Sequence, residues 1–336
     1  MSPARRYCSV SDSLITKPKP RYAYLTFLVD GSDYWKGALA LHKSLQLVGS
    51  RYPLVVAVTK EVPVKLRTLL SSHGCLIREI EDVALPESYT PDKYLQPYYI
   101  TQYKKLRFWE LTEFTKLCYL DADTIVLKNR DHLFDLIDSP SEIAGVQDCT
   151  CEGYKFHYRL CNTKYCQIEP SRAPWTFPDG KPVPAPYINA GFFMLMPNQK
   201  VAKDLVAKLW EFPPTGLAEQ DYLNHYFEGR IKILPLANNL MLCNFWNHPT
   251  KVSVETAEMV HYCVAGSKPW RFDPSKPNMD HPAVQELAKK WHEIYGTDTT
   301  TPLGAVSPNS ATLKAVVAAE RPLMSRSTVG GVRVVA

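Results

Sequence analysis

Two kinds of apolar segment alternate along the first half of the chain. Short runs rich in aromatic and β-branched residues predict strands at 22–29, 54–59, 76–80, 119–121 and 143–146. Longer stretches with apolar residues at helical spacing predict helices at 34–47, 64–71 and 102–111. Such alternation is typical of an α/β fold in which a parallel sheet carries helices on both faces.

The second half of the chain has a weaker pattern. Residues 149–186 contain cysteines, prolines and tryptophan with little periodicity, which predicts a long loop near a ligand site. Helical spacing returns at 198–210, 219–227 and 281–295. Small and polar residues predict flexible ends at 1–20 and 297–336. We therefore expect a single domain over residues 21–296 between two flexible ends.

Composition narrows the class of protein. Of the 336 residues, 45% are hydrophobic, which is enough for a substantial core. The net charge of +5 is spread out, and no run of five or more basic residues favours a nucleic-acid partner. Since no segment has the apolar length of a signal peptide or a membrane span, we expect a cytoplasmic protein without a membrane partner.

The nine cysteines are an odd number, which favours thiols in a reducing compartment over a disulfide framework. Four of them lie close together in the sequence and leave a structural zinc site open: Cys149, Cys151, Cys161 and Cys166. Their spacing differs from the paired C-x₂-C pattern of zinc knuckles. Free, mostly buried thiols are therefore the prediction, and the role of these four stays open.

Two carboxylates, Asp121 and Asp123, close an apolar, strand-like run. Side chains two positions apart in an extended segment point to the same side. Hard cations such as Mg²⁺ and Mn²⁺ bind carboxylate oxygens and leave positions free for substrate phosphates. The pair therefore indicates a metal site for a nucleotide diphosphate, at the strand end where open α/β sheets bind ligands. The alternative is an ordinary Asp-x-Asp turn.

A second segment, residues 261–270, supplies the groups that the aspartates lack. His261 can complete a metal shell, Gly266 allows the main chain to approach an anion, and Lys268 can neutralise a phosphate. Taken singly, His261 would be interpreted as a buried histidine and Lys268 as a surface lysine. Together with the aspartates, they indicate a clamp for a metal-bound diphosphate.

Four segments occur in an order that resembles glycosyltransferase family eight, the retaining GT-A enzymes that include glycogenin. They are residues 121–127 (Asp-Ala-Asp-Thr-Ile-Val-Leu), 187–191 (Tyr-Ile-Asn-Ala-Gly), 218–221 (Ala-Glu-Gln-Asp) and 261–270 (His-Tyr-Cys-Val-Ala-Gly-Ser-Lys-Pro-Trp). Within the family, the galactinol synthases are the most similar group, because residues 148–152 (Asp-Cys-Thr-Cys-Glu) and 245–249 (Phe-Trp-Asn-His-Pro) match as well. The resemblance covers residues 21–296.

The resemblance implies a GT-A type α/β fold, a Rossmann-like mixed sheet with helices on both faces. It implies that Asp121, Asp123 and His261 bind a metal, with Mn²⁺ expected and Mg²⁺ as the alternative. Gly266 and Lys268 match the family's contacts to the diphosphate of a UDP-sugar.

Further matches concern the rest of the sugar nucleotide. Tyr34 stands where the family stacks an aromatic ring on the uracil, and the main chain around Thr26 would border the same base. Lys105 matches a lysine that reaches the donor. Without the resemblance, Tyr34 would be interpreted as a core aromatic residue and Lys105 as a solvated helical lysine. The segment beneath the donor sugar is matched by Asn189, Ala190 and Gly191.

The catalytic candidates are Gln220, Glu219 and Asp148. Gln220 matches a glutamine near the anomeric carbon, and Glu219 stands where glycogenin has an aspartate. The alternative for both is favourable charge and polarity at a helix N-terminus. Asp148 follows a predicted strand and is a candidate for the sugar pocket, with a turn or cap as its alternative role.

The activity implied is transfer of galactose from UDP-galactose to myo-inositol with retained configuration, giving galactinol and UDP. The alternatives are a glycogenin-like transfer from UDP-glucose and transfer to another small polyol. Trp246 stands where glycogenin has its acceptor tyrosine, which argues against self-glycosylation. A silent sugar-nucleotide binder is disfavoured, because the metal and phosphate residues are all present. Asp148, Asn244 and His248 are candidates for contacts to inositol hydroxyls, and a purely structural role is the alternative for each of them. A homodimer is left open.

Overall fold

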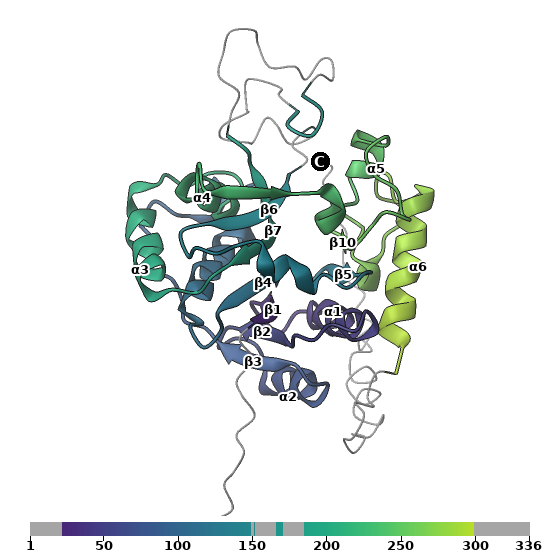
Figure 1. Cartoon of the computed structure of the whole chain (residues 1–336), viewed down its shortest axis with the longest axis horizontal. Coiled ribbons are helices and arrows are strands. Elements are labelled where there is room, and N and C mark those ends of the chain that lie inside the picture. The colour runs from purple at the N-terminus through teal and green to yellow at the C-terminus, as the bar shows by residue number, and fades with distance from the viewer. Residues whose placement is uncertain (1–21, 149–150, 152–165, 171–184, 299–336) are drawn as a thin grey trace, which may run out of the picture.

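The computed structural model describes residues 22–148, 151, 166–170 and 185–298. Nearly all of the predicted flexible ends, and most of the loop predicted at 149–186, lie outside these residues. Within them, the core is a seven-stranded sheet of order β3-β2-β1-β4-β7-β6-β8 (Figure 1). Its strands are β1 (Tyr22–Leu28), β2 (Leu54–Val58), β3 (Leu76–Glu79), β4 (Lys116–Leu120), β6 (Ile143–Gln147), β7 (Ile188–Leu195) and β8 (Ile231–Leu234).

The first half of the sheet confirms the alternating pattern of the sequence. β1 pairs in parallel with β2 and β4, and β2 pairs in parallel with β3. The connections include helices α1 (Trp35–Leu47) and α2 (Val64–Ser72). Parallel neighbours require such crossover connections, which is why strand and helix patterns alternate in the sequence.

The side chains of β1 divide the interior into two cores. Ala23, Leu25 and Phe27 face the core that includes residues of α3 (Gln199–Lys208) and α4 (Glu219–Tyr226). Tyr24 and Leu28 belong to the other core, which includes residues of α1 and α2. Alternate side chains of a strand point to opposite faces, so helices cover both faces of this sheet, as predicted.

The second half makes the sheet mixed. β7 runs antiparallel to both β4 and β6, whereas β8 is parallel to β6. This agrees with the mixed sheet that the family resemblance implied. The hydrophobic pattern alone did not reveal β7 or β8, because β7 opens with the polar site segment and β8 has only four residues.

One predicted helix has a different form in the structure. The segment predicted as a helix at 102–111 is a 3₁₀ helix that spans Pro97–Glu110. Its residues Tyr103, Leu106 and Trp109 are completely buried and lie three positions apart. A 3₁₀ helix has three residues per turn, so this spacing keeps all three side chains on one face. A helix is therefore present where the sequence predicts one, but it is of the 3₁₀ type and begins at Pro97.

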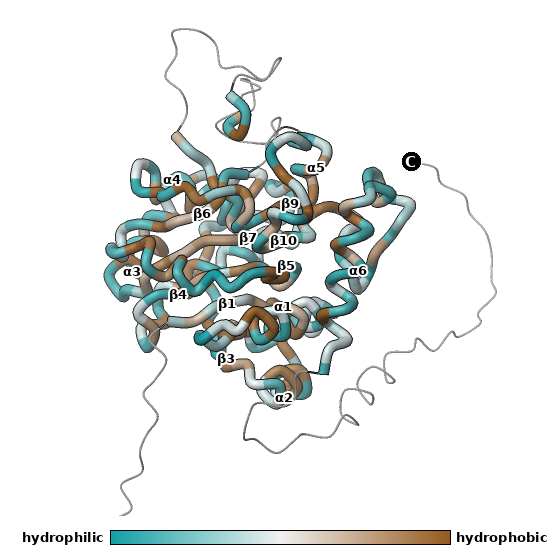
Figure 2. Tube along the Cα trace, turned by 45° about the vertical axis from the view of Figure 1, so that its right-hand side comes forward, coloured by the Kyte–Doolittle hydropathy of each residue, from teal (hydrophilic) through white to brown (hydrophobic). Residues whose placement is uncertain are grey.

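A small second sheet lies beside the first one. Its order is β5-β10-β9, formed by β5 (Thr124–Val126), β10 (Met259–His261) and β9 (Leu240–Met241). Helix α6 (Pro282–Gly296) packs against α1 next to this sheet (Figure 1). Figure 2 shows hydrophobic and hydrophilic stretches in succession along α6, as expected for a helix that buries one face.

The remaining helices are short. They are α5 (Asn244–Asn247) and the 3₁₀ helices Pro91–Lys93, Asp131–Asp135, Leu209–Glu211, Leu236–Asn239 and Pro269–Arg271. The predicted helices at 198–210, 219–227 and 281–295 correspond to α3, α4 and α6. Asn198 caps α3 by accepting from the N–H groups of Lys200 and Val201, and the His281 ring accepts from Ala283 at the start of α6.

Candidate active site

The first group of predicted site residues meets where the two sheets adjoin. β4 ends just before Asp121, whose main-chain N–H donates to the carbonyl of Gly191 in β7 at 2.8 Å. In the small sheet, His261 of β10 pairs with Thr124 of β5. The ligand atoms of Asp121, Asp123 and His261 consequently all lie within 4.8 Å of one another. We call these three residues the oxygen cluster.

The oxygen cluster fits a divalent cation. His261 Nε2 lies 3.3 Å from Asp123 Oδ1 and 3.8 Å from Asp121 Oδ2. Two carboxylates and one imidazole are a donor set that such a cation accepts. The position of Gly191 is part of the fit: a Cβ there would lie 2.2 Å from His261 Cε1 and 2.9 Å from Asp121 Oδ2. Any larger residue would fill the space beside the ligands.

The charges in this cluster are strongly coupled. Burial alone lowers the pKa of His261, but the nearby Asp123, Cys263 and Asp121 raise that pKa to about 9. Burial raises the pKa of Asp123, yet Lys268 and His261 hold it well below its usual range. A cation that binds here would therefore compete with the proton of His261.

Lys268 adds a positive charge at the edge of the oxygen cluster. Its Nζ donates to the Asp123 carboxylate and to the carbonyl of Tyr262. The turn that carries it depends on Gly266, which has a φ of +84° and where a Cβ would lie 2.6 Å from the Lys276 side chain. Lys268 thus lies beside the oxygen cluster, and its contact to a diphosphate, like that of Gly266, stays a prediction.

Lys105 is buried instead of solvated. Its Nζ lies 3.1 Å from Asp121 Oδ1 and 2.9 Å from Glu219 Oε1, and it donates to the carbonyl of Ala190 at 3.3 Å. Burial raises the pKa of Glu219, and the Lys105 charge opposes that rise. Lys105 therefore links the candidate metal ligand Asp121 to the start of α4.

The second group of predicted residues forms a polar network around Gln220. Gln220 Nε2 donates to Asp148 Oδ2 at 2.6 Å, and Gln220 Oε1 accepts from the main chain of Ala190 at 2.9 Å. Asn189 Nδ2 donates to Asp148 Oδ2 at 3.3 Å and to Gln220 Oε1 at 3.2 Å. These contacts bring together Asp148, which directly follows β6, Asn189 of β7 and Gln220 of α4.

The start of β7 joins the two groups. Asn189 contacts the Gln220 network, while Gly191 lies against the oxygen cluster. α4 begins directly after Ala218, which has a φ of +52°. A non-glycine residue with positive φ is strained, and such strain is found where surrounding contacts enforce a functional geometry. Here the next two side chains contact different groups: Glu219 pairs with Lys105, and Gln220 contacts Asn189 and Ala190 of β7.

The residues predicted near the uracil lie on α1 and β1. The ring of Tyr34 meets that of Trp270 edge to face, with 5.3 Å between the ring centroids. Asp33 connects this side to the Lys268 turn, because it accepts from Trp270 Nε1 at 3.0 Å and pairs with Arg271. Thr26 is completely buried within β1. Their contacts to a base stay a prediction.

Four residues of this region were missed by the sequence analysis. Asn239 Nδ2 donates to Asn189 Oδ1 at 3.1 Å, and Tyr187 accepts from Gln220 at 3.1 Å. Tyr119 donates to Asp121, and Asp33 makes the contacts described above. Three of them lie close in sequence to predicted site residues: Tyr119 to Asp121, Tyr187 to Asn189 and Asp33 to Tyr34. This proximity is the only signal by which the sequence could have indicated them. For Asn239 the sequence carries no comparable signal.

Within the described part of the chain, no helix combines the length and the apolar character that a membrane span requires. The cytoplasmic location expected from the sequence stays a prediction.

Comparison with known proteins shows the family of this chain. The model of Glycosyl transferase family 8 matches residues 25–273. Galactinol synthase 1 of Arabidopsis thaliana is 41% identical over 307 residues, which cover 89% of this chain and 88% of that protein. Galactinol synthase 2 of Solanum lycopersicum is 44% identical over 277 residues, with 82% and 80% coverage.

Solved structures agree with the fold. The glycosyltransferase GlyE of Streptococcus pneumoniae TIGR4 is 16% identical, with a TM-score of 0.54, over 92% of this chain and 67% of that chain. The galactosyltransferase LgtC, solved with donor and acceptor sugar analogues, is 19% identical, with a TM-score of 0.53, over 84% of this chain and 98% of that chain. The predicted GT-A type fold is therefore confirmed, and the chain is a glycosyltransferase that belongs to glycosyl transferase family 8.

Proposed function

We propose that this glycosyltransferase moves galactose from UDP-galactose to myo-inositol, giving galactinol and UDP with retained configuration. The observation that carries the proposal is the 41–44% identity to galactinol synthases over at least 80% of both chains. The arrangement of charged and polar groups supports it, because a cation-binding cluster and a polar pocket adjoin across the start of β7.

Departure of UDP creates negative charge that the protein has to stabilise. Asp121, Asp123 and His261 would hold a divalent cation, expected to be Mn²⁺, which would act as a Lewis acid on the diphosphate. Lys268 would contact the phosphates as a preorganised positive charge from the edge of the oxygen cluster. The main chain at Gly266 can approach the same oxygens, since no side chain intervenes.

The sugar would lie over the polar network of Asn189, Gln220 and Asp148. Because Gln220 donates to Asp148 and accepts from Ala190, its amide is fixed in one orientation before the donor arrives. We propose that the acceptor hydroxyl attacks the anomeric carbon on the face that UDP leaves. In that step the C–O bond to UDP breaks, the new C–O bond forms, and the hydroxyl proton passes to a phosphate oxygen.

Glu219 has a supporting part in this scheme. Its carboxylate is 2.9 Å from Lys105 and is buried, so it is engaged in an ion pair instead of facing the sugar as a nucleophile. We infer that Glu219 fixes Lys105, which in turn orients Asp121. Asp148 is the carboxylate that Gln220 and Asn189 both contact. A covalent galactosyl adduct on Asp148 would favour double displacement over same-face transfer.

Recognition of inositol requires several polar partners, because each hydroxyl that is buried without a hydrogen-bond partner weakens binding. Asp148 is the candidate with a side chain in the polar network. His248 is completely buried, and its ring nitrogens face Glu169 and two cysteine sulfurs. Asn244 is completely buried as well. Asp148 therefore remains our principal proposal for an acceptor contact.

The decisive experiment combines a product assay with intact-protein mass spectrometry. With Mn²⁺, UDP-galactose and myo-inositol, we expect free galactosyl-inositol and no sugar mass on the protein. UDP-glucose and a panel of other polyols are the matched controls. A ladder of hexose increments on the protein would support a glycogenin-like activity instead, through a residue other than Trp246. A different polyol that reacts as well as myo-inositol would contradict the assignment of myo-inositol as the acceptor.

A further inference from the structure

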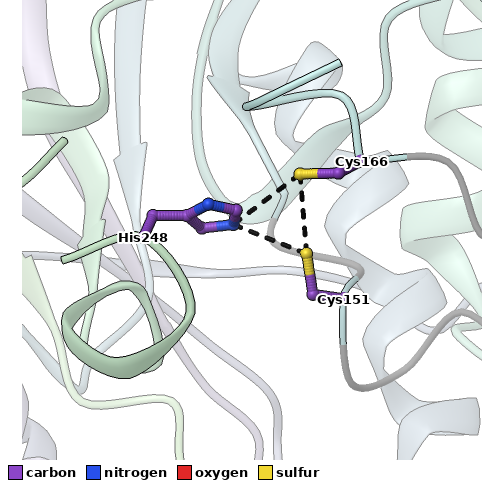
Figure 3. A group of neighbouring side chains, drawn as sticks. All are labelled: Cys151, Cys166 and His248. Carbon is purple, nitrogen blue, oxygen red and sulfur yellow. Dashed lines mark hydrogen bonds between the residues drawn. The ribbon is translucent and has the colours of Figure 1, made fainter. Parts of the chain in front are cut away.

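A second group of metal-ligating side chains lies outside the proposed catalytic centre. Cys151, Cys166 and His248 converge in Figure 3, with the two sulfurs 3.6 Å apart. His248 Nε2 lies 3.5 Å from Cys151 Sγ and 4.0 Å from Cys166 Sγ. All three residues are buried. We call them the thiol cluster.

These separations are those of ligands around one tetrahedral ion. With Zn–S bonds of about 2.3 Å and a Zn–N bond of about 2.05 Å, tetrahedral angles give S···S of about 3.8 Å and S···N of about 3.6 Å. The three separations in the thiol cluster fall within about 0.5 Å of these values. The two sulfurs are too far apart for a disulfide, whose bond is about 2.05 Å long.

The surroundings orient the ligands. Glu169 Oε2 lies 2.7 Å from His248 Nδ1, so a proton on Nδ1 is held by the carboxylate and the Nε2 lone pair faces the sulfurs. A carboxylate behind a histidine is the usual partner of a zinc-bound imidazole. The main-chain N–H of Glu169 also points at Cys166 Sγ, at 3.3 Å. This donor would stabilise a thiolate.

We propose that Cys151, Cys166 and His248 bind a structural Zn²⁺ ion, an assignment that goes beyond the proposed transferase activity. Binding releases the two thiol protons, and the two thiolates balance the charge of the ion. Soft thiolates with imidazole select zinc over Mn²⁺ and Mg²⁺. Three ligands lie among the described residues, which leaves one position of a tetrahedral ion for a further donor.

The position of this ion gives it a definite structural effect. Next to Cys166, the Gln167 side chain donates to the carbonyls of Asp148 and Tyr187, at 2.9 and 2.7 Å, and accepts from the Tyr187 N–H at 3.0 Å. His248 directly follows α5. Zinc would thus fasten residues 166–170 to α5 and support the ends of β6 and β7, where the catalytic candidate Asp148 lies.

The test is the metal content of the full-length protein. After expression with added Zn²⁺, treatment with a chelator and gel filtration, elemental analysis should find about one zinc per chain. Cys166→Ser should lose most of it. Cys75→Ser, which removes a buried thiol elsewhere in the core, should retain it, and so should Asp123→Asn, which alters only the oxygen cluster. Zinc-free wild-type protein, or equal zinc in Cys166→Ser, would overturn the proposal.

A second measurement needs no variant and so does not depend on how the variants fold. Co²⁺ supplied in place of Zn²⁺ should give the strong visible bands of a tetrahedral site and thiolate-to-cobalt charge transfer. Cobalt bound with octahedral, oxygen-type spectra only would contradict the assignment. Non-reducing mass spectrometry should find Cys151 and Cys166 unlinked, whereas a disulfide between them in freshly purified protein would also overturn it.

Discussion

The oxygen cluster and the thiol cluster each combine one buried histidine with two potentially anionic ligands, yet the fold positions them differently. The oxygen cluster is carried by strand ends and by the pairing of β5 with β10. The thiol cluster joins residue 151 and residues 166–170 to the end of α5. The hydrogen bonds of the sheets position the ligands of the oxygen cluster, whereas the ligands of the thiol cluster lie in segments outside both sheets.

Their charge environments differ as well. Lys105 and Lys268 contact the carboxylates of the oxygen cluster, so that cluster is already balanced before a cation arrives. The thiol cluster is contacted by a carboxylate and a main-chain N–H of Glu169, which orient its ligands. We infer that the first cluster holds an exchangeable ion that it shares with substrate, and that the second retains its ion as part of the structure.

The largest expected effect is on stability. Lys105→Met should lower the free energy of unfolding by about 3 to 5 kcal/mol, because it leaves the buried carboxylate of Glu219 without its cation and removes the charge that contacts the partly exposed Asp121. Chemical denaturation of the metal-free protein measures this. Lys104→Met is the matched control, since Lys104 pairs with the half-exposed Asp82 and should change stability by about 1 kcal/mol or less. Equal losses of stability in the two variants would refute the claim that Lys105 balances the charges of Asp121 and Glu219.

Asp123→Asn should affect activity and leave the zinc unchanged. Galactosyl transfer should fall by about a hundredfold or more, because Lewis-acid stabilisation of the leaving group amounts to several kcal/mol. Steady-state kinetics across a Mn²⁺ titration measures the loss, with Asp92→Asn on the exposed surface as the control. Zinc lost together with activity would show that the two clusters are not independent.

Lys268→Met should have a smaller effect on the same reaction. Loss of one charge-assisted contact to phosphate should lower kcat/KM by about 10- to 150-fold, equivalent to about 1.5 to 3 kcal/mol. Lys290→Met removes an exposed lysine and is the matched control. An unchanged kcat/KM would place Lys268 outside the diphosphate site.

The smallest effect concerns pH. The pKa of His261 is raised from 6.5 to about 9 in the metal-free protein, so its charged form contributes stability that is complete below pH 6.5 and is lost as pH rises through 9. The apparent affinity for Mn²⁺ should rise by up to about tenfold per pH unit between pH 7 and 9, because binding displaces this proton. Calorimetric titration at several pH values checks this. A flat profile would contradict the pairing of His261 with Asp123.

The contrast between the clusters also marks the limit of sequence reasoning. Asp121 and Asp123 were found because a strand end, a two-residue spacing and carboxylate chemistry coincide locally. The sequence predicts His248 as an inositol contact and the four neighbouring cysteines as free thiols, with a structural zinc site among those four as the open alternative. The C-x-C and C-x₄-C spacings gave no reason to add a histidine that lies 97 residues from Cys151 and 82 from Cys166.

By itself, the sequence determined the local features of this protein: the parallel β-α half of the sheet, the helix starts at Asn198 and His281, and the polar motifs at strand ends. These follow from side-chain periodicity and capping, which act over a few residues. Tertiary structure alone decided the antiparallel insertion of β7, the burial of Lys105 between two carboxylates, and the meeting of Cys151 and Cys166 with His248. Such contacts depend on strand order and on packing between segments that are far apart in the sequence. Side-chain periodicity describes only neighbouring residues, so it does not predict them.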